Sequence, residues 1–125
     1  MTNADLVRKI AEHLGWRWES RHMLGYWHPP TCTPELCDFQ HHVVDAYMPD
    51  FLSPAVFWSE FEKWRMANHL DYMHCTHDNI RIFEIFRHHE DASTEPKHGE
   101  AASEVSAEDA GCRAWLAALE AGGSK

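Results

Sequence analysis

Cysteine and histidine side chains gather in one proline-rich stretch of the chain. Cys32 and Cys37 are separated by four residues, and His41 and His42 follow after three more. Thiolates and imidazoles are common Zn²⁺ ligands, and three ligands on one loop would fasten that loop to a fourth ligand elsewhere. The pattern therefore makes Cys32, Cys37, His41 and His42 candidate zinc ligands. Single side chains outside the stretch that could join them are His28, Cys75 and His77.

A second interpretation of the same stretch needs no metal. The Cys-x4-Cys spacing lies at the edge of the range found in zinc sites, and no second cysteine pair mirrors it. The chain also contains 11 histidines, which makes chance proximity easy. A polar loop with one or two thiols turned inward explains the composition without a ligand. We therefore expect no cofactor, with zinc at this loop as the alternative.

The run His74-Cys75-Thr76-His77 places a thiol between two imidazoles. Neighbouring residues on a strand point to opposite faces, so His74 cannot activate Cys75; His77 shares the face of Cys75 but stands beside it. The carboxylates elsewhere show no paired pattern of the kind that acid–base catalysis requires: Asp50, Glu60, Glu62 and Glu84. The sequence therefore assigns no catalytic residue, and a metal- or cysteine-dependent enzyme is the least favoured function.

The strongest helix signal in the chain begins at Ser53. Ser53 is a suitable N-cap, and Pro54 then occupies the first helical position, where its missing N–H costs nothing. Phe57, Phe61 and Trp64 recur at helical spacing and form one apolar face. This segment is expected to be the core helix around which the other elements are arranged.

The other expected elements follow from apolar spacing and turn residues. Two apolar-rich runs flank Asp78-Asn79, a pair that tolerates positive φ, so residues 70–87 are expected to form a β-hairpin in which Cys75 faces Ile82. Residues 88–105 lack periodicity and have almost no apolar side chains, which predicts a flexible linker. The remaining expected elements are a helix at 3–14 capped by Asn3, extended segments at 16–19 and 23–28, a loop at 29–48 with a short strand at 43–47, and a last helix capped by Ser106.

The expected hairpin determines the expected fold class. Both of its faces are half apolar, which indicates that helices cover it on two sides. A hairpin of two strands is marginal alone, so the segment from Trp16 to His28 is expected to complete a sheet of at least three strands. The sequence therefore predicts an α+β fold, a small antiparallel sheet sandwiched between helices in α-β-α layers. Its length predicts a single domain, residues 1–125.

Three short motifs and the order of the expected elements carry a resemblance. The motifs are Gly15-Trp16, the run Pro49-Asp50-Phe51-Leu52-Ser53 leading into Phe57-Trp58, and the alanine-rich segment 110–119. Together they resemble the small proteins of the phage ABA-sandwich family over most of the chain. The resemblance implies a sheet between helices in a protein of phage or prophage origin, and it implies no activity. The loop with Cys32 and His41 departs from what the family leads us to expect.

Charge and hydropathy argue against several classes of partner. Twenty acidic and 11 basic residues give a net charge of −9, which repels nucleic acids and anionic membranes. No apolar run approaches the ~20 residues that span a bilayer, and the N-terminus does not resemble a signal peptide. We therefore expect a cytoplasmic protein, in the host cell if it is phage-encoded, with cysteines that are free or metal-bound.

The absence of a catalytic motif, the aromatic surplus and the long loop favour a binding function. The leading hypothesis is a non-enzymatic accessory protein of phage type that binds a small cytosolic ligand or a host protein. A zinc-stabilised interaction module is the alternative. An exposed sheet edge would also allow a homodimer. Part of the aromatic run Trp16, Trp18, Tyr26 and Trp27 is a candidate for a binding surface, although most of it is expected in the core.

Overall fold

The computed structural model describes residues 2–21, 24–28, 30, 43–44, 50–87 and 97–121. The expected α+β class is confirmed, because these residues form helices and small antiparallel sheets. The elements are α1 (Asn3–His13), β1 (Arg17–Arg21), β2 (Leu24–His28), β3 (Val43–Val44), α2 (Pro54–Ala67), β4 (Asp71–His77), β5 (Ile80–Phe86), β6 (Lys97–Ser103) and α3 (Ala107–Glu120).

The expected hairpin is confirmed as β4 and β5. Asp78 and Asn79 both have positive φ, 50° and 67°, as a two-residue hairpin turn requires. The turn fixes an antiparallel register in which Cys75 lies opposite Ile82, as the sequence predicts. The two faces of the hairpin therefore carry the side chains that the sequence assigns to them.

The strand that completes this sheet is β6, so the prediction that the segment from Trp16 to His28 would do so is wrong. The order is β4-β5-β6, whereas β1, β2 and β3 form a second antiparallel sheet. The second sheet contacts α1 through Arg8, whose guanidinium lies 5.9 Å from the ring centroids of Trp18 and Trp27.

The predicted linker at residues 88–105 is also corrected in part, because its residues 97–103 form β6. This strand contains no β-branched side chain and no apolar alternation, the signals by which strands are recognised. The absence of a side chain at Gly99 lets the strand approach α3 closely. A Cβ added at Gly99 would lie 2.1 Å from the carbonyl oxygen of Ala114. The strand is therefore selected by close packing against α3. Residues 88–96 lie outside the described residues.

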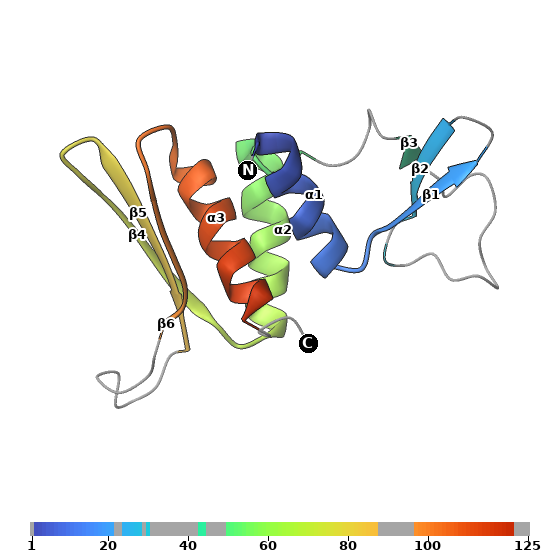
Figure 1. Ribbon diagram of the computed structural model, residues 1–125. Coiled ribbons are helices and arrows are strands. Elements are labelled where there is room, and N and C mark those ends of the chain that lie inside the picture. Colours follow the sequence, from blue (N-terminus) through green and yellow to red (C-terminus); the bar gives the residue numbers. More distant parts are fainter. Residues whose placement is uncertain are drawn as a thin grey trace.

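The helices of the described chain lie on one face of the β4-β5-β6 sheet (Figure 1). Helix α3 packs along β5 and β6, and α1 packs on α3. Helix α2 reaches the sheet through aromatic side chains: the ring centroids of Phe61 and Phe83 are 5.4 Å apart. The second helical layer of the expected α-β-α arrangement is not among the described residues.

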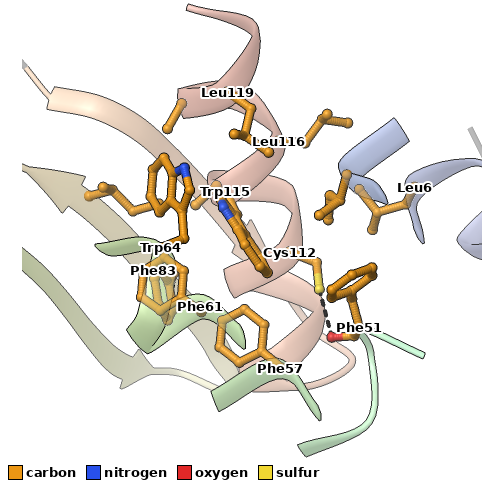
Figure 2. Packing of buried hydrophobic residues seen from close by; sticks show 14 of the residues in the cluster. Leu6, Phe51, Phe57, Phe61, Trp64, Phe83, Cys112, Trp115, Leu116 and Leu119 are labelled. Carbon is orange, nitrogen blue, oxygen red and sulfur yellow. Dashed lines mark hydrogen bonds between the residues drawn. The ribbon is translucent and has the colours of Figure 1, made fainter. Parts of the chain in front are cut away.

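Helix α3, rather than α2, occupies the centre of the molecule. Its small residues Ala110, Gly111, Ala114 and Ala118 are buried, so other elements approach its backbone closely. Between them Trp115 is fully buried among aromatic rings from other elements (Figure 2). Its ring centroid lies within 6.0 Å of those of Phe51, Phe57, Phe61 and Trp64.

Capping residues fix the helix starts. Thr2 caps α1 in a reciprocal box with Asp5, which corrects the expected cap at Asn3. Ser53 occupies the N-cap position of α2 and Pro54 its first helical position, as predicted, but the Ser53 side chain makes no capping hydrogen bond. At α3 the predicted cap is confirmed, because the Ser106 hydroxyl accepts a hydrogen bond from the Asp109 N–H at 3.0 Å.

A buried polar network ties β6 to α3 at this cap. The Ser103 hydroxyl donates to Asp109 Oδ2 at 2.6 Å, and Arg113 Nε donates to the same oxygen at 3.1 Å. Ser103 Oγ in turn accepts from the Val105 N–H at 3.0 Å. The carboxylate of Asp109 is buried but well supplied with donors, so the network stabilises the turn between β6 and α3.

Candidate functional site

The candidate zinc ligands Cys32, Cys37, His41 and His42 lie outside the residues that the structure describes. Of the side chains that could join them, His28 is buried on β2, whereas Cys75 and His77 are exposed on β4. Among the described residues, no group of three or more His, Cys, Asp or Glu side chains is placed to hold a metal ion. The zinc site stays a prediction that elemental analysis of the purified protein decides.

The Cys75 thiol stands on an open strand. His74 points to the opposite face, where its ring packs against Trp58 and Phe83 with centroid distances of 5.6 and 6.0 Å. His77 shares the face of Cys75 but lies at the turn, with Nε2 3.5 Å from Asp78 Oδ2. Within the described part of the chain, Cys75 has neither an enclosed pocket nor an oriented base of the kind that nucleophilic catalysis requires.

The other described cysteine, Cys112, has a structural role. Its Sγ donates a hydrogen bond to the Phe51 carbonyl oxygen at 3.0 Å within the core (Figure 2). Burial, reinforced by the carboxylates of Asp109 and Asp50, raises the pKa of the Cys112 thiol far above its usual range. The group is therefore a neutral thiol that joins α3 to the segment before α2.

Alkylation of the native protein should separate these two thiols. Iodoacetamide is expected to modify Cys75 readily and to spare Cys112, because only the former is exposed. Peptide mass spectrometry after brief treatment at pH 8 measures both. Denaturing the protein before treatment is the control and should equalise the two rates. Early modification of Cys112 in the native protein would contradict the packing in Figure 2.

The feature that distinguishes the surface is the uncovered face of the β4-β5-β6 sheet, here called the outer face. It is the face opposite α3, and it includes several apolar side chains that no helix of the described chain covers. Met73 is 50% exposed and Ile80 is 37% exposed. The outer face is made by Asp71, Met73, Cys75 and His77 of β4, Ile80, Ile82, Glu84 and Phe86 of β5, and Glu100 and Ala102 of β6.

The apolar content of the outer face differs from that of an ordinary solvated sheet face. Antiparallel sheets with one open face normally alternate apolar side chains inward and polar side chains outward. Here alternate residues of the two hairpin strands direct apolar side chains and a thiol to the open face: Met73, Cys75, Ile82 and Phe86. At the turn end, a shallow hollow of ≈ 220 Å³ is lined by Ile80, Ala102, Ser103 and Glu104. Exposed apolar patches of this kind mark interaction surfaces.

The same face has a defined charge. Glu84 and Glu100 lie directly opposite each other on β5 and β6. Each of these carboxylates also has an interaction partner within the protein. The outer face therefore combines the apolar side chains of the hairpin with the acidic residues Glu84 and Glu100.

Comparisons with protein-family models, curated proteins and solved structures found no match. The resemblance to the phage ABA-sandwich family consequently stays an expectation. Among the described helices, none combines the length and the apolar content that a membrane crossing requires.

The aromatic run near the N-terminus divides between core and surface. Trp27 is fully buried, Trp16 is half-buried and Trp18 is 45% exposed. Trp18 is held by its tilted contact with Trp27, at a centroid distance of 5.3 Å.

The sequence did not predict the outer face as a binding surface. The alternation along the hairpin assigns the side chains of the outer face correctly. Half-apolar strands are, however, equally compatible with a sheet that helices cover on two sides.

Proposed function

We propose that the protein is a non-enzymatic accessory protein that binds another protein through the outer face. The observation that carries the proposal is the row of Met73, Ile82 and Phe86 on the face of the hairpin that no helix of the described chain covers; Met73 is exposed, and the other two are partly buried. Burying the exposed parts of these side chains contributes about 25 cal/mol per Å² of apolar surface removed from water. A partner that covers this row would supply the second layer that an antiparallel sheet usually packs against.

The net charge of the protein indicates the chemistry of the partner. The net charge of −9 favours association with a basic partner through long-range attraction. We therefore propose a partner segment with apolar side chains and at least one basic residue. The phage resemblance suggests that the segment belongs to a bacterial host protein.

Matched substitutions test the surface. Ile82→Lys places a cation at the centre of the outer face, where it repels a basic partner but has Glu84 nearby to support folding. Met66→Lys makes the same charge change on α2, where Met66 is 65% exposed and away from the outer face. Both proteins should unfold near the wild-type temperature.

The test is capture from bacterial extract by the wild type and the two variants, with the retained proteins identified by mass spectrometry. We expect a specific protein to be retained by the wild type and by Met66→Lys, and to be lost with Ile82→Lys. Equal capture by all three, or loss with Met66→Lys as well, contradicts the proposal. If nothing is captured and a metabolite panel shifts the melting temperature, the small-ligand form of the hypothesis replaces it.

A further inference from the structure

The two edges of the β4-β5-β6 sheet differ in how they are protected. Edge strands usually carry Lys, Pro or a bulge that discourages pairing with another chain. The edge strand β6 has Lys97 and Glu100, and its register shifts between Ile85 and Phe86. The edge strand β4 runs for seven residues in unbroken register with no Lys, Arg or Pro. Within the described residues, no strand pairs with the edge of β4 that faces away from β5.

We propose that two copies of the protein associate by antiparallel pairing of their β4 strands about a twofold axis at His74. The turn determines which backbone groups are available, because residues that flank a two-residue turn exchange hydrogen bonds and the pattern alternates from there. His77 and Ile80 flank the turn, so alternate residues of β4 direct their backbone groups to β5. His74 directs its N–H and C=O groups to the open edge, and it pairs there with the partner's His74.

This register continues the apolar row of the outer face from one copy to the other. At each end it places the partner's His77 opposite Asp71, whose carboxylate is already 3.4 Å from Arg65 Nη1. It places Met73 opposite the partner's Cys75 on either side of the axis, which extends the apolar row across both copies. Apolar cross-strand pairs stabilise antiparallel sheets.

A face-to-face arrangement of two copies is less favourable than edge pairing. Stacked outer faces would bring Glu84 and Glu100 of one copy towards the same acidic pair of the other. Edge pairing leaves both outer faces open on the same side of a six-stranded sheet. A binding partner could therefore still reach them, and the proposed dimer does not depend on the proposed binding function. Because a seven-residue edge buries less than a standard interface, the dimer is weak and reversible, with Kd on the order of micromolar.

Disulfide trapping tests the register. Opposed residues that do not exchange hydrogen bonds have Cα atoms about 4.5 Å apart, which suits a disulfide. Met73→Cys should therefore form a covalent dimer through the partner's Cys75 under mild oxidation. The wild-type Cys75 pair lies on a diagonal of about 7–8 Å and should crosslink at least tenfold more slowly. Met66→Cys, which places a thiol on exposed α2, is the control for random collision.

Mass spectrometry of the crosslinked peptides and sedimentation equilibrium complete the test. We expect a bond between position 73 and Cys75, and a wild-type dimer whose Kd rises at least about tenfold in Thr76→Pro. Thr76 directs its N–H to the open edge, so proline there spares the ladder to β5. A wild type that stays monomeric at about 0.5 mM, far above the proposed Kd, overturns the proposal. So does a dimer in which Met66→Cys crosslinks as fast as Met73→Cys.

Discussion

Replacing Trp115 by alanine is expected to lower the free energy of unfolding by about 3–5 kcal/mol. Trp115 is fully buried on the central helix, and its indole contacts aromatic rings from the segment before α2 and from α2 itself. Alanine leaves a cavity that Phe51 and Phe61 cannot fill without losing contacts of their own, so the transfer and cavity costs add. Urea denaturation followed by circular dichroism measures the loss.

Trp18→Ala provides the matched control for Trp115→Ala. Trp18 is 45% exposed, and its main contacts are one tilted ring and one guanidinium. The same truncation there should cost only about 1 kcal/mol. Similar losses for the two variants would mean that α3 is not the centre of the core.

Replacing Gly99 by alanine is expected to cost at least about 2–3 kcal/mol, although the change adds a single methyl group. The added Cβ would lie 2.1 Å from the Ala114 carbonyl oxygen and 3.0 Å from the Ala118 nitrogen. Both atoms belong to the backbone of α3, so no side-chain rotation relieves the overlap and the helix must move away from β6. The slight gain in strand propensity from alanine is far smaller than this cost.

Ala102→Val is the control for Gly99→Ala. It adds two carbons to the same strand on the exposed outer face, where the higher strand propensity of valine should make it neutral or slightly stabilising. Thermal unfolding of both variants gives the comparison. An unchanged melting temperature for Gly99→Ala would contradict the close approach of β6 and α3.

The elements predicted correctly are those that local chemistry determines. Pro54 after Ser53 defines the start of α2, and Asp78-Asn79 defines the hairpin turn and hence its register. The strand β6 is determined instead by a tertiary contact. Gly99 does not favour a strand by itself, but it allows the backbone of α3 to pack closely against β6. The central position of α3 was missed for the same reason: its alanines and Gly111 permit close approach but carry no strong apolar signal.

The sequence predicts which side chains share the candidate binding surface, but it does not predict that this surface is exposed. The hairpin register places Met73, Cys75, Ile82 and Phe86 together, and this placement is confirmed. Whether that face is covered depends on where α2 and α3 pack, and no local pattern in the strands encodes that choice. The candidate metal ligands Cys32, Cys37, His41 and His42 stay a prediction, since they lie outside the described residues.

The measurement that bears most directly on binding through the outer face is a calorimetric titration of the captured partner with three forms of the protein. We predict that Ile82→Lys raises Kd at least about tenfold, equivalent to about 1.4 kcal/mol, while Met66→Lys stays within about twofold of the wild type. Lower ionic strength should tighten wild-type binding if the partner contributes the proposed basic residue. Equal affinities for the wild type and Ile82→Lys would contradict binding through the outer face.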